Sequence, residues 1–265
     1  MNTKIKAWIN LVLLLITLGV NYLGGSGIIN DTSQGEVSDM YHTLITPAGF
    51  AFSIWSVIYG LLLISLIVLI VKHDDAHYGK AIDRITPYLW ISFVANMLWI
   101  ITFSYLQIGI STILIFIYLF SLTFIVRELG QINHQRRWLL PLTFGLNTGW
   151  VFIATVVNVA TYLVQIGWNG FGMAEETWAL IIMIVAFLLA VFVQFQLKNA
   201  VFPLPIAWAF FAIRQELQAT GSYATLEMTA LIIAGLLILL ALYFFIRNKF
   251  SLYPLHANRR VVTSV

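Results

Sequence analysis

Apolar runs long enough to cross a lipid bilayer occupy most of this chain and constrain its fold more than any other feature. A transmembrane helix needs about 20 apolar residues. Runs near this length lie at residues 7–22, 49–71, 86–105, 110–126, 138–162, 177–196 and 225–246, and a shorter one lies at 200–213. A transmembrane β-barrel would need alternating segments of about ten residues, and these are absent. The pattern predicts an all-α polytopic membrane protein with eight spans, or seven if the short run does not cross.

Composition supports this fold class. Of the 265 residues, 60% are hydrophobic and 9% are charged, whereas soluble domains carry about 25% charged residues. The absence of cysteine excludes disulfides and thiolate chemistry. A formal charge of +3 in such a chain gives no indication of nucleic-acid binding. The lipid bilayer is the expected partner, and a homodimer is compatible with the sequence.

The Lys and Arg residues predict the orientation of the chain. Cytoplasmic loops of membrane proteins are enriched in Lys and Arg. With a cytoplasmic N-terminus and eight spans, every Lys and Arg except Arg214 falls on the cytoplasmic side. The first run is interpreted as a membrane span rather than a cleaved signal peptide, because no A-x-A site follows it. The sequence therefore predicts a multi-pass cell-membrane protein with both termini cytoplasmic, including a tail at 251–265.

Two polar segments between the spans are predicted to be loops. Residues 24–46 contain acidic side chains and lie on the predicted outer side, and residues 72–84 are charged and lie on the cytoplasmic side. His73 and His77 in the second loop, with Asp74 and Asp75, have spacing that a metal site could use. A solvated loop is the alternative that we favour, so no metal site is predicted.

The stretch 40–60 leads from the acidic loop through Pro47 into an apolar helix that carries Phe52, Trp55 and Tyr59. We expect Pro47 in the first turn, where its missing N–H costs little. Trp55 and Tyr59 are four residues apart, so their rings should project from one face. The stretch predicts an aromatic wall near the outer mouth of a pocket.

Tryptophans inside other spans provide partners for this wall. Trp8, Trp138, Trp168 and Trp178 lie at span ends, as is typical of the interfacial aromatic belt. Trp99, with Phe103, and Trp150 lie deeper in the outer half of their spans. These side chains are predicted either to line one pocket with Trp55 or to pack tightly between helices.

Three amides lie within apolar spans: Asn96, Asn147 and Asn158. Such residues commonly form interhelical hydrogen bonds. A ligand pocket also needs a few polar groups within an apolar wall, so a binding role is the second interpretation. The pattern Asn96-x-x-Trp99 recurs as Asn147-x-x-Trp150, which indicates either an old duplication or similar composition.

Arg214 is the one basic residue on the predicted outer half. A charge inside the membrane is costly and marks a functional candidate. Arg214 is predicted to hold a ligand carboxylate, to pair with Glu216 or Glu227, or to snorkel to the interface.

No catalytic residues are predicted. The sequence has no Ser–His–Asp set, no HExxH motif, no phosphate-binding glycine loop and no acidic pair within a span. No span contains histidine, so haem ligation by buried imidazoles is not expected. An enzyme is therefore the weakest of the function classes considered.

Three segments resemble the TspO/MBR family, the tryptophan-rich sensory proteins related to the mitochondrial translocator protein. They are Pro47 with Trp55-Ser-x-Ile-Tyr59, then Asn96-x-x-Trp99 with Phe103, then Trp150-x-Phe-x-Ala154 with Asn158. The resemblance covers about residues 7–162. It implies a five-helix unit at 1–162, followed by about three additional transmembrane helices at 163–250. The chain is accordingly expected to be an extended, divergent member.

The resemblance implies a ligand-binding protein with a sensory or regulatory role. Its expected ligand is a hydrophobic or amphipathic small molecule such as a tetrapyrrole or a sterol, and no cofactor is otherwise predicted. The ligand-binding residues expected from the pattern and the resemblance are Pro47, Phe52, Trp55, Tyr59, Asn96, Trp99, Phe103, Asn147, Trp150, Asn158 and Arg214. The alternative is a transporter of a small amphipathic or anionic substrate that uses the C-terminal spans.

Overall fold

The computed structural model describes residues 1–133, 135–221 and 223–255, and the regular structure in these ranges is helical. The predictions for Arg259 and Arg260, and for most of the 251–265 tail, lie outside the described residues. The elements are α1 (Thr3–Gly25), α2 (Gln34–Met40), η1 (Gly49–Ser53), α3 (Ile54–Val71), α4 (Ala76–Ser104), α5 (Ile108–Gln131), α6 (Leu139–Gln165), η2 (Gly170–Gly172), α7 (Glu175–Leu197), α8 (Pro203–Thr220) and α9 (Ala224–Arg247).

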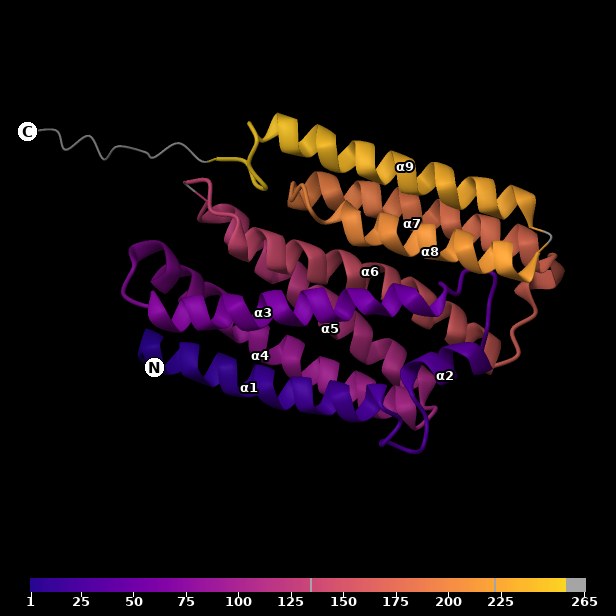
Figure 1. Ribbon diagram of the computed structural model, residues 1–265, viewed down its shortest axis with the longest axis horizontal. Helices are drawn as coiled ribbons and strands as arrows, with labels where there is room; N and C mark the ends of the chain where they lie inside the picture. The colour runs from indigo at the N-terminus through magenta and orange to yellow at the C-terminus, as the bar shows by residue number, and fades with distance from the viewer. Residues whose placement is uncertain (134, 222, 256–265) are drawn as a thin grey trace, which may run out of the picture.

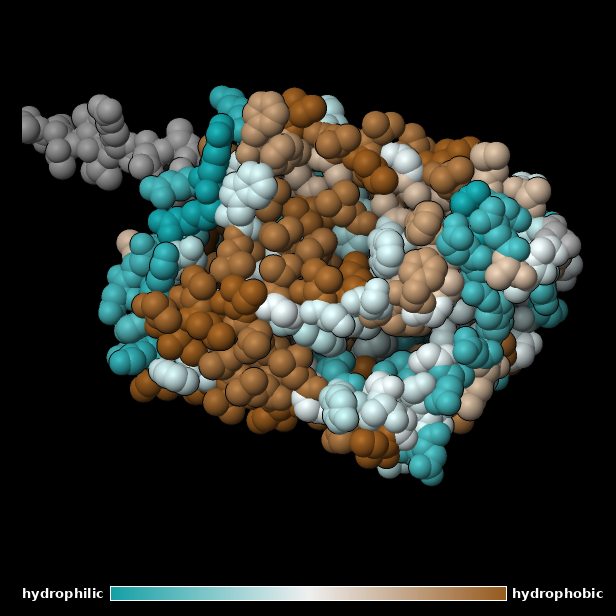
Figure 2. Space-filling model, viewed as in Figure 1, coloured by the Kyte–Doolittle hydropathy of each residue, from teal (hydrophilic) through white to brown (hydrophobic). Residues whose placement is uncertain are grey.

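The long helices lie side by side along the long axis of the molecule (Figure 1). Helices α7, α8 and α9 form one side, α1 and α4 form the opposite side, and α3, α5 and α6 lie between them. The N-terminus and the end of α9 lie at one end of the bundle, and α2 lies at the other, which we call the α2 end. Apolar residues cover the middle of the molecule and polar residues gather at both ends (Figure 2).

Seven of the described helices are long and apolar enough to cross a membrane: α1, α3 together with η1, α4, α5, α6, α7 and α9. The short run at 200–213 is part of α8, a continuous helix of 18 residues. This helix is about 27 Å long at the usual rise, and it extends through Arg214 and Glu216. It lies alongside α7 and α9 in the bundle (Figure 1).

Helix α6 is the centre of the bundle. In its span, 72% of residues are buried, compared with 28% in α1 and α7. Gly145 and Gly149 form a G-x-x-x-G pattern on α6, which allows close approach of a second backbone. A Cβ at Gly149 would meet the carbonyl oxygen of Phe202 and the ring of Pro205, and one at Gly145 would meet the amide of Asn199. These glycines therefore let α8 and the preceding turn pack directly on α6.

The prediction of a charged loop over residues 72–84 is wrong from residue 76 onward, because α4 begins at Ala76. Asp75 caps this helix by accepting hydrogen bonds from the backbone N–H groups of His77 and Tyr78. Residues of its first turns are buried at helical spacing: Tyr78, Ala81, Ile82 and Ile85. The apolar face was present in the sequence but masked by the surrounding charges.

Side-chain amides and hydroxyls form hydrogen bonds between neighbouring helices of the bundle. The Asn10 side chain on α1 donates to Thr86 and accepts from the indole of Trp90, both on α4. Ser65 on α3 and Thr143 on α6 share a hydrogen bond of 2.8 Å. Such interhelical hydrogen bonds contribute about 0.6–2 kcal/mol each, and they fix the register of the helices around the site.

Candidate functional site

A cavity of about 520 Å³ lies toward the α2 end of the bundle. Its walls come from α1, α2, η1, α3, α4 and α6, and α8 contributes Ala209. The face drawn in Figure 2 is hollowed in the region between α1 and α3. The cavity therefore combines helices from both halves of the chain, and we call it the central cavity.

Aromatic rings form much of its wall, with Trp55 at their centre. The Trp55 ring stacks on Tyr59 with centroids 5.0 Å apart and an interplanar angle of 14°, as the spacing of four residues predicts. Its centroid also lies 6.4 Å from that of Trp99 and 6.1 Å from that of Trp150. Offset and edge-to-face pairs at these distances are favourable. The ring of Phe52 meets Trp150 edge-on at 6.2 Å.

The start of the second span is shaped differently from the prediction. Pro47 precedes the helical residues by two positions instead of occupying the first turn, and the span opens with the 3₁₀ turn η1. Two hydrogen bonds fix this segment to α8. The N–H of Ala48 donates to the carbonyl of Ala212, and the indole of Trp208 donates to the carbonyl of Ala51. Helix α8 thereby positions the segment that places Phe52 at the cavity.

Asn158 joins three helices at the floor of the cavity. Its carbonyl oxygen accepts from the indole N–H of Trp99 at 2.9 Å. Its amide nitrogen donates to the hydroxyls of Ser111 and Thr112 on α5. Asn158 is 3% exposed, so these bonds satisfy groups that have no access to water. Trp99 and Asn158 are consequently held as one rigid unit.

A second polar chain runs along the α1 wall. The Tyr59 hydroxyl donates to the side-chain oxygen of Asn21 at 2.6 Å. The Asn21 amide donates to Asn96 at 2.8 Å and to the carbonyl of Thr17. Asn21 and Tyr59 line the cavity, whereas Asn96 lies behind them. Asn96 thus acts on the cavity by orienting Asn21.

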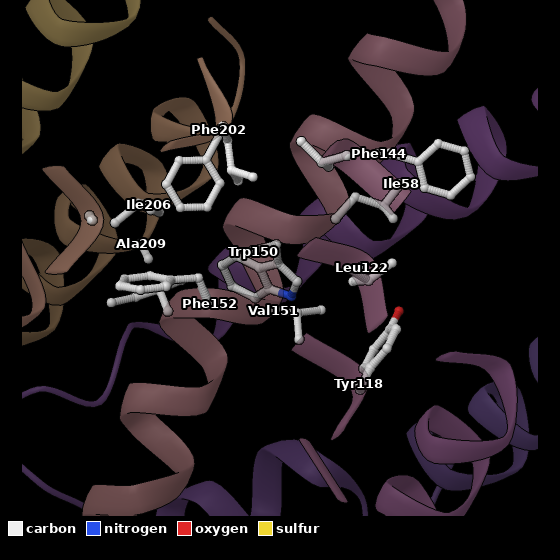
Figure 3. Close-up of a cluster of buried hydrophobic side chains, with 14 of the residues drawn as sticks. Ile58, Tyr118, Leu122, Phe144, Trp150, Val151, Phe152, Phe202, Ile206 and Ala209 are labelled. Atoms are coloured by element: carbon white, nitrogen blue, oxygen red, sulfur yellow. The ribbon is translucent and has the colours of Figure 1, made fainter. Parts of the chain in front are cut away.

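Trp150 differs from these groups because its indole N–H has no hydrogen-bond partner. The nitrogen is buried, and the residue is 2% exposed and lines the central cavity. In Figure 3 the indole nitrogen lies on the side of Val151 and Leu122, whose side chains offer carbon atoms only, and the opposite side of the ring is turned toward Phe202, Ile206 and Ala209. The amide nitrogen of Gln34 on α2 is a second buried, unpaired donor at this cavity.

No charged side chain within residues 1–133, 135–221 and 223–255 lines the central cavity. Among the described residues, no group of three or more His, Asp or Glu side chains could hold a metal ion. The polar groups that line it are the neutral side chains Asn21, Ser33, Gln34, Ser38, Ser56, Tyr59, Asn158 and Thr161 and the indoles. The arrangement suits an uncharged apolar body that offers hydrogen-bond acceptors.

Eight of the predicted binding residues line this cavity: Pro47, Phe52, Trp55, Tyr59, Trp99, Phe103, Trp150 and Asn158. Asn147 lies apart, where its side-chain oxygen accepts from Tyr118 at 3.2 Å. Arg214 does not line the cavity either, and it makes no ion pair within the described residues. The Glu216 carboxylate instead lies 3.5 Å from the imidazole of His42.

Helix α2 brings residues to the cavity that the sequence reasoning missed. It lies within the predicted loop 24–46 and supplies Gln34 and Ser38. Its signal in the sequence is a capping box, in which Ser33 accepts from the N–H of Glu36 and Glu36 accepts from the N–H of Ser33. The hydrogen bond from the Ser33 backbone N–H holds the pKa of the Glu36 carboxyl below its ordinary value, helped by the Ser33 hydroxyl and opposed by slight desolvation.

In a comparison with protein families, the family model described as TSPO-like protein matches residues 7–243. The match therefore continues beyond residue 162, where the motif resemblance ended, and includes most of α9. No curated protein and no solved structure matches the chain.

Proposed function

The chain belongs to the TSPO-like protein family, and we propose that this multi-pass membrane protein binds a hydrophobic or amphipathic small molecule in the central cavity. Binding would serve a sensory or regulatory role. The three segments that resemble the TspO/MBR family contain Trp55, Trp99 and Trp150, and these side chains meet at the cavity.

The observation that carries this proposal is the unpaired indole N–H of Trp150. A buried donor without a partner costs about 1–3 kcal/mol, and helix packing alone gives no reason to keep it. Because the nitrogen itself is buried, a ligand carbonyl, ether or carboxyl oxygen would pair this donor after a small movement of the side chains around it. The buried amide nitrogen of Gln34 on α2 is a second donor that such a movement would open to the same ligand.

The size and character of the cavity support a ligand of drug or cofactor size. Small-molecule pockets commonly measure about 300–1,000 Å³ and are mostly apolar, with a few oriented polar groups. A volume of about 520 Å³ falls in this range. The motif resemblance implies tetrapyrroles or sterols. Both are apolar bodies with oxygen-bearing edges, which the two unpaired donors could bind.

Tryptophan-fluorescence quenching by a panel of porphyrins and sterols tests the proposal in purified, membrane-reconstituted protein. Trp55→Ala removes the ring at the centre of the wall and should weaken binding at least tenfold. Trp178→Ala is the matched control, because Trp178 does not line the central cavity. Equal losses of affinity in two correctly folded variants would contradict the proposal.

Transport of a small amphipathic or anionic substrate is the second candidate. The observation that favours it is α8, which carries the half-buried Arg214 and also contributes Ala209 to the cavity. Saturable uptake into proteoliposomes that is lost in Arg214→Ala would support transport. Ligand binding without flux would support the sensory role.

A further inference from the structure

A second cavity, of about 390 Å³, lies at the α2 end of the bundle, and the ligand-binding proposal above does not use it. It is enclosed by residues 42–45, the end of α6, the η2 segment and the first turns of α7. We call it the end cavity. Leu44, Ile45, Leu163 and Ile182 form part of its apolar wall, so it could enclose the hydrocarbon part of a ligand.

Two indoles form a corner in this cavity. The centroids of Trp168 and Trp178 lie 4.6 Å apart and their planes meet at 64°. Phe171 buttresses the Trp168 ring edge-on at 5.1 Å. Trp168 and Trp178 are both partly exposed and line the cavity. The negative faces of aromatic rings attract a cation within about 6 Å, and tryptophan is the strongest of them.

The charges around the end cavity are acidic. Glu175 in the first turn of α7 lines it, and no Lys or Arg of the described part of the chain does. Glu175 makes no ion pair within the described residues. His42 also lines the cavity, and the carboxylate of Glu216 lies next to its imidazole. Other acidic side chains belong to elements that reach this end of the bundle (Figure 1), namely the α1–α2 connection, α2 and the first turns of α7 and α9: Asp31, Glu36, Asp39, Glu176 and Glu227. Arg214 on α8 offsets part of this negative charge. The summed field of these charges would attract cations and repel anions.

We propose that the end cavity binds a weakly hydrated organic cation of the quaternary-ammonium class. The cationic head would lie against the Trp168 and Trp178 rings, with Glu175 balancing its charge. An attached apolar group would contact Leu44, Ile45 and their neighbours. This class combines low hydration cost, positive charge and apolar surface, which are the three properties that the cavity complements.

The test uses equilibrium dialysis to measure how tightly choline binds to the whole chain in phosphatidylglycerol nanodiscs. The matched probe is 3,3-dimethylbutanol, which has nearly the same shape without the charge. Choline should bind at least tenfold more tightly than the alcohol. Equal binding of the two probes, or no binding of choline, would overturn the proposal.

Variants locate the site. Trp178→Leu and Glu175→Gln should each weaken choline binding at least fivefold, whereas Glu176→Gln, which does not touch the cavity lining, should change it less than twofold. Retained ligand binding in the central cavity shows that a variant is folded. Equal effects of Glu175→Gln and Glu176→Gln would show that choline responds only to the overall surface charge, and this would overturn the proposed site.

The same cation could arrive free or as a lipid headgroup, and nanodiscs of phosphatidylcholine distinguish these sources. Weakened binding of free choline in that lipid would support occupation by the headgroup. Unchanged binding would support a free organic cation.

Discussion

The two Asn-x-x-Trp pairs have the same spacing, yet their indoles differ in hydrogen bonding. On α4, the N–H of Trp99 donates to Asn158 at 2.9 Å. On α6, the N–H of Trp150 is buried and unpaired. Both rings line the central cavity beside Trp55. The comparison separates a tryptophan whose polar group is bonded within the fold from one whose polar group is unpaired, and the second is the donor that the proposed ligand would use.

The neighbouring helices explain the difference. Trp99 faces a region of α6 and α5 that offers Asn158 and hydroxyl groups. The nitrogen of Trp150 lies on the side of Val151 and Leu122, whose side chains offer no hydrogen-bond acceptor (Figure 3). The glycine pattern on α6 brings the turn before α8 and the start of α8 close to the other side of this ring.

The largest expected effect comes from separating α8 from α6. In Gly149→Leu, the new side chain would overlap the backbone of Phe202 and the ring of Pro205, because these atoms cannot move independently of α8. We expect destabilisation of about 3 kcal/mol or more and loss of ligand binding. Thermal unfolding in detergent measures the first effect and ligand titration the second.

Gly60→Leu is the control for this prediction, because a Cβ at Gly60 meets no atom within 4 Å. Gly60→Leu should unfold within a few degrees of the wild type. Equal melting temperatures for Gly149→Leu and the wild type would show that α8 does not depend on this contact.

The next largest expected effect on stability distinguishes the side-chain amide of Asn158 from that of Asn147. Asn158→Leu leaves the Trp99 indole without its acceptor and removes the donor to the Ser111 and Thr112 hydroxyls on α5, so it should destabilise the protein by about 1–3 kcal/mol. Asn147→Leu removes one bond of 3.2 Å to Tyr118 and should cost less. Urea or thermal unfolding of both variants measures the difference. A larger loss of stability in Asn147→Leu than in Asn158→Leu would contradict the role of Asn158 in connecting α4, α5 and α6.

Phenylalanine substitutions compare the two tryptophans directly. Trp99→Phe deprives Asn158 of a donor and should lower stability by about 1 kcal/mol. Trp150→Phe removes a donor that has no partner, so stability should change less than in Trp99→Phe. Affinity for an acceptor-bearing ligand should fall several-fold more in Trp150→Phe. Stability and affinity losses that run in parallel would remove the distinction between the two residues.

The smallest expected effect is a local loss of stability of helix α2 when the pH is lowered. A carboxyl whose pKa is lowered on folding adds stability above its ordinary pKa of 4.5, and this is lost as the pH falls through the lowered value. The capping box of Glu36 should therefore open below about pH 4.5. Hydrogen exchange in Gln34–Met40 should accelerate there in the wild type. In Glu36→Gln, which keeps a capping side chain, the same acceleration would contradict the assignment to Glu36.

Local spacing predicted the parts of the site that lie on one helix. The common face of Trp55 and Tyr59 followed from their separation by four residues, and the structure stacks the two rings. The capping box of α2 and the G-x-x-x-G pattern of α6 are also visible in the sequence. Asp75 before Ala76 could likewise have marked the start of α4. These signals are local, so a single sequence contains them.

Contacts between distant helices could not be predicted in this way. Trp99 pairs with Asn158 on another helix and not with Asn96 on its own. That choice depends on the axial register of α4 and α6, which the packing of several helices sets together. The same holds for Arg214, which makes neither of the ion pairs predicted for it within the described residues. Residue type and spacing identified the candidates, and tertiary register decided their partners.

The most direct test of the account follows the indole N–H groups by NMR. The nine tryptophans would be labelled with ¹⁵N, and the Trp99 and Trp150 signals would be assigned with the phenylalanine variants. On addition of an acceptor-bearing porphyrin or sterol, the Trp150 signal should move downfield as its N–H becomes hydrogen-bonded, while the Trp99 N–H keeps its bond to Asn158. A saturating ligand that leaves the Trp150 signal unchanged would contradict the central claim.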